Sequence, residues 1–309
     1  MDFELNEDQR AIIDAVEGLL ARHAGPARAI GLAADGAYDA ELDAALCGAG
    51  FMDVALGEST GALEAALVVE AVSRRGGVAA VAAQALVVPG LCGEALGAPV
   101  ALAAADQIAA PVRFAEQASY ALIDAGEDAR LVEIASGTAE RVDSNFGFPM
   151  GRLGDSALEG GRQLGLGSGA RLRAWWRVAL AAEALGAMES ALEVTVDYLK
   201  QRRQFGRTIA SFQAVQHRLA ECKVLIEGSR WLTYEAAWLG APDHAAAVAA
   251  AHTLATAGRV FVETHQLSGA IGFTREHDLH VWSMRLQALR LEMYGVAAHR
   301  RAATDTRWV

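Results

Sequence analysis

The sequence predicts a mainly α-helical protein with a small β-domain in its middle. In roughly the first hundred and the last 140 residues, apolar side chains recur every three or four positions, which is the spacing of an amphipathic helix. Between Pro111 and Gly169 that spacing is lost, and short runs bounded by glycine and aspartate replace it. We therefore expect an all-helical domain over 1–108, a middle β-domain over 109–169 and a four-helix bundle over 170–309.

The N-terminal part predicts several helices separated by glycines. Helical spacing runs from Glu7 to Ala24, and Asn6 stands where an N-cap residue would accept a backbone hydrogen bond. Further helical segments are expected around 38–47, 62–74 and 78–96, because glycine-containing breaks separate these apolar stretches.

The middle part predicts short strands followed by a linker. Its runs ASYALID, ARLVEIA and AERVDS favour β-structure and carry no helical periodicity. The glycine-rich stretch GGRQLGLGSG at 160–169 is typical of a linker, and helical spacing resumes at Arg171.

The last part predicts four long helices with short connections, which is the pattern of an antiparallel bundle. The third helix is expected to run from about His244 to Leu267. The apolar stripes of the other three are formed by Leu172, Trp175, Ala179, Leu185, Met188, Leu192 and Leu199; by Phe212, Val215, Leu219, Cys222 and Ile226; and by Leu279, Trp282, Leu286, Leu289, Met293 and Val296.

Composition excludes several classes of protein. A net charge of −11 and a pI near 5.2 argue against a nucleic-acid-binding surface, which needs clustered positive charge. The three cysteines lie far apart and no HExxH occurs, so we expect no metal site. The acidic start MDFELNEDQR is unlike an export signal, and the most apolar run, Val78 to Leu91, is shorter than the roughly 20 residues that cross a bilayer. We expect a cytoplasmic protein outside the membrane.

The first candidate binding motif is RRQFGRTIASFQAVQ, residues 202–216, between two predicted helices. Arg202 and Arg203 end the first helix, Phe205 and the following glycine turn the chain, and Gln213 opens the next helix. Guanidinium groups match phosphate oxygens two at a time, so a pyrophosphate is a suitable ligand. On charge alone, the favoured interpretation is that these arginines complement the negative end of the helix dipole.

The second candidate motif is HQLSGAIGFTREHD, His265 to Asp278. It contains Gln266, Gly269, Ala270 and Gly272 at a predicted helix end. Glycine there allows a close backbone approach to a ligand, although it is also common as a helix C-cap.

Taken together, the two motifs resemble those of the acyl-CoA dehydrogenase family, and the opening helix is similar to that of the family as well. The resemblance implies FAD as cofactor, an acyl-CoA substrate and an electron-transfer flavoprotein as electron acceptor. It implies that the ADP part of FAD contacts Arg202, Phe205 and Gln213 from one side, or Gln266, Gly269 and Ala270 from the other. Ala270 replaces the second glycine of the family pair. The continuation FTREHDLHVW is similar to the branch acting on steroid and other bulky acyl-CoA substrates.

The chain departs from the family pattern in two respects. Its middle domain is reduced, and it contains neither a T-E-P-G-A-G-S type loop nor a W-I-T-N type strand, which in the family contact the flavin ring. The glutamate base is also absent, since counting from the motifs to its two family positions reaches Trp176 and Met293. Glu292 lies beside the second position, about 100° round the expected helix and toward Arg285 and His299, so we predict that it faces solvent. The catalytic residue is therefore unknown at this stage, and Trp176 is expected either to wall an acyl pocket or to pack in the core.

Three hypotheses follow from the resemblance and the departures. The first is the smaller, base-lacking subunit of a heteromeric α2β2 acyl-CoA dehydrogenase, in which a larger partner chain supplies the base and the loops around the flavin ring. The second is a self-sufficient homo-oligomer with an unusual base such as Glu292. The third is a non-catalytic scaffold subunit that has lost FAD.

Overall fold

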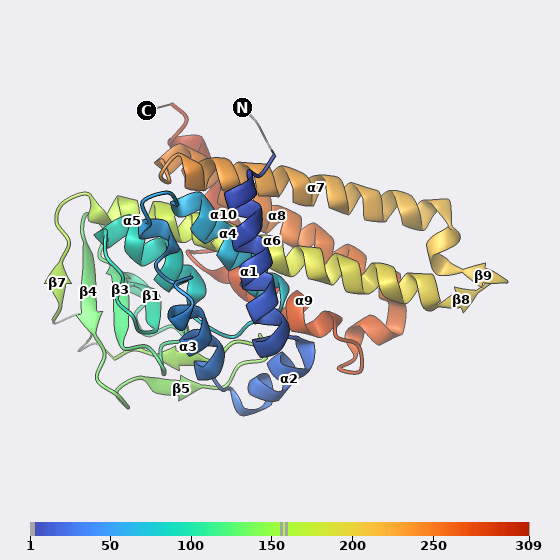
Figure 1. Ribbon diagram of the computed structural model, residues 1–309, viewed down its shortest axis with the longest axis horizontal. Coiled ribbons are helices and arrows are strands. Elements are labelled where there is room, and N and C mark those ends of the chain that lie inside the picture. Colours follow the sequence, from blue (N-terminus) through green and yellow to red (C-terminus); the bar gives the residue numbers. More distant parts are fainter. Residues whose placement is uncertain (1–3, 155–156, 158–159, 309) are drawn as a thin grey trace.

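The computed structural model describes residues 4–154, 157 and 160–308, and it is mainly helical as predicted (Figure 1). The N-terminal helices are α1 (Glu7–His23), α2 (Pro26–Asp35), α3 (Ala40–Gly48), α4 (Ala62–Arg74) and α5 (Val88–Cys92), and a π-helical segment (Ala82–Val87) leads into α5. The predicted cap of α1 is confirmed, because the Asn6 side chain accepts a hydrogen bond from the Gln9 amide at 2.8 Å and Gln9 bonds back to Asn6.

The β-domain consists of two small sheets. One has the order β1-β3-β4-β7, formed by β1 (Val100–Ala104), β3 (Tyr120–Asp124), β4 (Ala129–Glu133) and β7 (Arg162–Gln163). The other has the order β2-β6-β5, formed by β2 (Val112–Arg113), β6 (Met150–Arg152) and β5 (Glu140–Val142). Only the β1–β3 pairing is parallel among these described strands.

Strand β1 lies inside the stretch that we expected to be wholly helical, so that expectation is wrong at its end. Its sequence, VALAA, is rich in alanine, the best helix former, and carries no polar alternation. Parallel pairing of all five residues with β3, together with burial on both faces, decides the conformation instead.

The C-terminal region contains α6 (Ser168–Gln201), α7 (Gln213–Trp238), α8 (Asp243–Ser268), α9 (Leu279–Leu291) and α10 (Val296–Asp305). In Figure 1, α6, α7 and α8 run along the long axis, and the hairpin of β8 (Arg203–Gln204) and β9 (Arg207–Thr208) projects at their right-hand end. The segment Asp243–Phe273 is long and apolar enough to cross a bilayer, but half of its most apolar window is buried in the molecule. We interpret α8 as a core helix of the bundle.

The fourth predicted helix ends earlier than expected, because the stretch through Val296 is divided into α9 and α10. Met293 and Tyr294 have φ angles of 49° and 67°, in the left-handed region that disfavours residues other than glycine. The backbone therefore turns between Glu292 and Gly295, although the apolar spacing continues through Met293 to Val296.

Helices α4 and α6 cross with their backbones in close contact at Gly186. A Cβ atom added there would lie 2.1 Å from the Glu70 carbonyl oxygen and 2.6 Å from the Arg74 amide nitrogen. Since neither backbone atom can move independently of its helix, this position admits only glycine.

We predict that Gly186→Ala destabilises the fold by roughly 1–3 kcal/mol or more, because the added methyl group forces α4 and α6 apart. The free energy of unfolding, measured by urea denaturation, checks this. Gly18→Ala is the matched control, since an added Cβ on α1 meets no atom within 4 Å. Its effect should be neutral or stabilising by up to about 1 kcal/mol. Equal effects of the two substitutions would contradict the close helix contact.

Candidate active site

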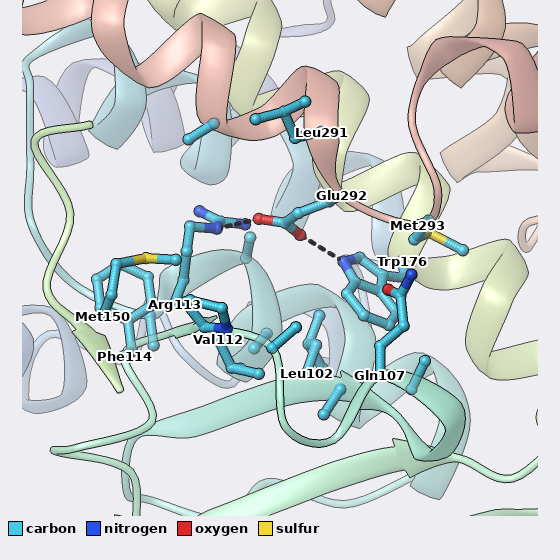
Figure 2. Close-up of a pocket in the computed structure, with 18 of the residues that line it drawn as sticks. Leu102, Gln107, Val112, Arg113, Phe114, Met150, Trp176, Leu291, Glu292 and Met293 are labelled. Carbon is cyan, nitrogen blue, oxygen red and sulfur yellow. Dashed lines mark hydrogen bonds and ion pairs between the residues drawn. The ribbon is translucent and has the colours of Figure 1, made fainter. Parts of the chain in front are cut away.

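A cavity of about 750 Å³ lies where the β-domain meets the helices (Figure 2). Its walls come from the π-helical segment, β1, β2 and the loop joining them, α6, and the end of α9. Most lining side chains are small and apolar, including Ala80, Ala82, Ala83, Leu102, Ala109, Val112, Ala179 and Ala288. A pocket of this size and lining is suited to a small organic ligand.

A cluster of charged side chains forms one wall of this pocket. Arg113, from β2, donates two hydrogen bonds to the Glu183 carboxylate of α6, at 2.9 and 2.8 Å. The Arg113 Nε atom donates to Oε1 of Glu292 as well. The indole nitrogen of Trp176 donates to Oε2 of Glu292 at 2.9 Å, so each Glu292 oxygen has one donor, as Figure 2 shows.

The cluster is mostly removed from solvent, and this shifts the pKa of its members. Side chains of Arg113 and Glu183 are each 10% exposed, and that of Glu292 is 20% exposed. Burial raises the pKa of Glu292 above its ordinary value, although Arg113 and the Trp176 hydrogen bond act in the opposite direction. Burial alone lowers the pKa of Arg113, but the two carboxylates raise it further, so Arg113 stays charged.

A second arginine lies behind this wall. The Arg285 side chain is fully buried and donates to the Gly77 carbonyl oxygen at 3.0 Å. The Phe148 ring lies 4.8 Å from the Arg113 guanidinium carbon and 5.0 Å from that of Arg285, so both cations contact the same ring. Burial lowers the pKa of Arg285 to about 10, partly offset by Glu183.

The prediction that Glu292 faces solvent is wrong. It assumed that the last helix continues, but α9 ends at Leu291, and the left-handed residues Met293 and Tyr294 redirect the backbone. The carboxylate consequently points into the cavity (Figure 2). The same turn is tied to the β-domain, because the Tyr294 hydroxyl donates to Oδ1 of Asp106 at 2.5 Å.

Trp176 combines the two roles that the sequence left open, since it is 6% exposed, packs in the core and also lines the pocket. Met293 lines the pocket too. Arg113 and Glu183 were missed by the sequence analysis. The available signal was Glu183 itself, a lone carboxylate within the apolar run VALAAEALGA of α6.

The predicted cofactor residues lie elsewhere, at the far end of the bundle. Arg202 and Gln213 flank the β8–β9 hairpin and are exposed. Phe205 is at the hairpin tip with a φ of 53° and is 87% exposed. At the end of α8, Gln266, Gly269 and Ala270 are also exposed.

Both motifs lie at the same end of the bundle. The ring of Tyr198, in the last turn of α6, lies 5.3 Å from that of His277, which is near the end of the second motif. Trp176 is on the same helix as Tyr198 but far from its end, because α6 rises about 1.5 Å per residue and Arg202 is thus about 39 Å from Trp176. The structure brings the two motifs together and separates them from the pocket.

Comparison with known proteins identifies the family. Residues 172–296 match the model of the acyl-CoA dehydrogenase C-terminal domain. The chain is 33% identical to acyl-CoA dehydrogenase IpdE2 of Mycobacterium tuberculosis, over 90% of this chain and 91% of that protein. The chain belongs to the acyl-CoA dehydrogenase family.

Solved structures agree with this assignment at the level of fold. The ChsE4-ChsE5 complex of Mycobacterium tuberculosis contains a chain that is similar with a TM-score of 0.80, at 20% identity over 100% of both chains. The Tcur3481-Tcur3483 steroid ACAD is similar with a TM-score of 0.78, at 26% identity over 97% of both chains.

The motif residues of this acyl-CoA dehydrogenase chain have the chemistry that FAD binding requires. The side chains of Arg202, Gln213 and Gln266 form no hydrogen bond or ion pair within the described ranges, so their donors are available to a ligand. An added Cβ at Gly269 would meet nothing within 4 Å, which leaves space beside the backbone. Arginine and amide donors on an open surface fit a pyrophosphate.

We predict that Glu292→Gln changes how stability depends on pH. The pKa of Glu292 is higher in the folded chain than its value of about 4.5 in the unfolded chain. The folded protein therefore loses stability as pH rises from about 4.5 through the folded pKa. Glutamine does not titrate, so the free energy of unfolding of the variant should improve relative to the natural chain between pH 4.5 and pH 7.5. Urea denaturation at both pH values measures this difference.

Trp176→Phe is the companion variant, because it removes a hydrogen bond that lowers the Glu292 pKa. Its stability should therefore fall more steeply with pH than that of the natural chain. If the free energy of unfolding of Glu292→Gln differs from that of the natural chain by the same amount at both pH values, Glu292 has no raised pKa.

Proposed function

We propose that this chain is a subunit of an FAD-dependent acyl-CoA dehydrogenase that catalyses α,β-dehydrogenation of an acyl-CoA thioester. The observation that carries the proposal is the position of Arg202, Gln213 and Gln266, which are exposed and unpartnered in the described structure, at one end of the bundle. Phe205, Gly269 and Ala270 lie beside them and complete the surface that would contact the ADP part of FAD.

The separation of about 39 Å along α6 supports a site shared between chains. A cofactor held by the motif residues extends away from this chain's own pocket, so its flavin ring belongs to a neighbouring chain. Since the family strings that contact the flavin ring are absent from this sequence, we assign them and the catalytic base to a larger partner subunit. The similar ChsE4-ChsE5 and Tcur3481-Tcur3483 structures are each named for two different chains, which supports a heteromer.

Within this arrangement each motif residue has a defined task. Arg202 would donate hydrogen bonds to the pyrophosphate, Gln213 and Gln266 would add amide donors, and Gly269 would allow the backbone to come close. When bound, FAD would supply the hydride acceptor for the β-carbon, and an electron-transfer flavoprotein would receive the electrons. We place the substrate among bulky, steroid-type acyl-CoA thioesters, because one similar structure is a steroid ACAD.

The shared site predicts the behaviour of the purified chain. Alone it should be colourless and inactive, and on co-expression with a larger acyl-CoA dehydrogenase subunit it should form a yellow, active complex. Native mass and the visible spectrum measure both properties. A yellow and active homo-oligomer would contradict the proposal, and a stable complex without flavin would favour the scaffold hypothesis.

Arg202→Gln should lower the affinity of the complex for FAD by about tenfold or more, since a charged hydrogen-bond donor to phosphate is lost. Flavin content after dialysis, measured from the absorbance of the complex, checks this. Arg22→Gln, on the exposed face of α1, is the matched control and should retain full flavin. Equal flavin content in both variants would remove Arg202 from the cofactor site.

A second candidate is favoured by one observation, the Glu292 carboxylate in an apolar pocket. A carboxylate with a raised pKa is suited to removing the α-proton of a thioester, so the chain could use Glu292 as base in a homo-oligomer. In that case Glu292→Gln should lower kcat by at least about a hundredfold. Full turnover by this variant would eliminate the candidate.

A further inference from the structure

We propose that this chain's own pocket binds an uncharged acyl group, and that Glu292 is the residue that excludes acyl chains ending in a carboxylate. The inference rests on the proposed function only in taking an acyl-CoA thioester as the ligand. It concerns the cavity of about 750 Å³ and is independent of which chain holds the flavin ring.

The pocket offers apolar contact over most of its surface. Its alanine-rich walls leave open volume where larger side chains would fill it, and the π-helical segment contributes Ala82 and Ala83 to one side. Burial of an alkyl or ring-shaped group against such walls contributes roughly 25 cal/mol per Å² of apolar surface. An uncharged acyl group therefore needs no polar partner to bind.

Only one cation lines the pocket among the described residues, and its charge is already matched. Arg113 gives two hydrogen bonds to Glu183 and a third to Glu292. Arg285, the other nearby cation, contacts the Phe148 ring and is not in the pocket wall. Asp106, at the edge of the pocket, adds a further negative group.

A carboxylate at the end of an acyl chain would lose its water in this pocket without gaining a free cation. Burying an unpaired charge is strongly unfavourable, and proximity to an ionised carboxylate adds repulsion. A methyl or ring terminus has neither cost. The pocket should consequently discriminate against the charged ligand while accepting the apolar one.

Of the two carboxylates that Arg113 holds in the pocket wall, Glu292 is the more exposed to a ligand. Its side chain is 20% exposed, twice the value for Glu183, which is held by two Arg113 bonds on the helix side of the cluster. Substituting glutamine for Glu292 keeps the size but removes one negative charge. In that variant Glu183 is the one carboxylate of the cluster that remains beside Arg113. A ligand carboxylate can then pair with Arg113 in place of Glu292.

The test uses two CoA thioethers, S-decyl-CoA and S-(9-carboxynonyl)-CoA, which lack the thioester carbonyl and cannot react. Their dissociation constants are measured by calorimetry on the natural complex, or on the chain alone if it forms no complex. We expect the natural chain to prefer the decyl ligand by about tenfold or more, and Glu292→Gln to reduce that preference by about tenfold, mainly through tighter binding of the carboxylate ligand.

Two variants control this measurement. Glu292→Asp keeps the charge and should keep the preference, whereas Glu193→Gln, in a surface ion pair with Arg74, should change nothing. Equal preference in the natural chain and in Glu292→Gln would overturn the role of Glu292 and leave the proposed function standing. Failure of both thioethers to bind any variant would instead contradict acyl-CoA as the ligand.

Discussion

The close contact between α4 and α6 is the constraint on which the rest of the structure depends. At Gly186 the two backbones leave no room for a side chain, and the surrounding polar groups are used to hold this geometry. The Ser73 hydroxyl donates to the Glu183 carbonyl oxygen at 2.6 Å, and the Ser190 hydroxyl donates to the Arg74 carbonyl oxygen at 2.7 Å. The Ser190 bond satisfies a carbonyl at the end of α4 that has no partner within its own helix, and the Ser73 bond ties α4 to the middle of α6. The crossing thereby fixes α6, and α6 carries residues of both candidate sites.

Because α6 is one continuous helix of 34 residues, it sets the distance between the pocket and the cofactor motifs. Trp176, Ala179 and Glu183 follow each other at three and four residue steps, so they share one face and together line the pocket. Arg202 ends the same helix at the other extremity. A helix of this length does not bend to bring its ends together, so the proposed function joins the two ends through a neighbouring chain. The helical spacing of α6 therefore places its pocket residues on one face, and its length is the reason for proposing an assembly of two chains.

Much of the helical architecture could be predicted from sequence, and the reasons are local. The Asn6 cap, the extent of α8 and the positions of both motifs depend on residues close together in the chain, which spacing and capping rules describe. The charged wall of the pocket could not be predicted, because Arg113, Glu183 and Glu292 come from three distant segments. The break before Met293 was equally hidden, since left-handed backbone there is imposed by tertiary contacts such as that between Tyr294 and Asp106. The ligand roles of Arg202, Phe205, Gln213, Gln266, Gly269 and Ala270 stay predictions.

The turn that places Glu292 combines two unfavourable features. Consecutive left-handed residues at Met293 and Tyr294 cost about 1–3 kcal/mol each, and burying the Glu292 carboxylate adds a desolvation cost. A continued helix with an apolar residue at position 292 would avoid both. Buried ion pairs contribute little net stability compared with well-packed apolar side chains, so stability alone does not explain the arrangement. The strained backbone and the Glu292 carboxylate, whose pKa is raised, lie at the same cavity. Hydrogen bonds from Arg113 and Trp176 fix the orientation of this carboxylate. This combination is typical of a site that acts on a ligand, and it agrees with the ligand-selecting role that the apolar walls and the matched charge of Arg113 give to Glu292.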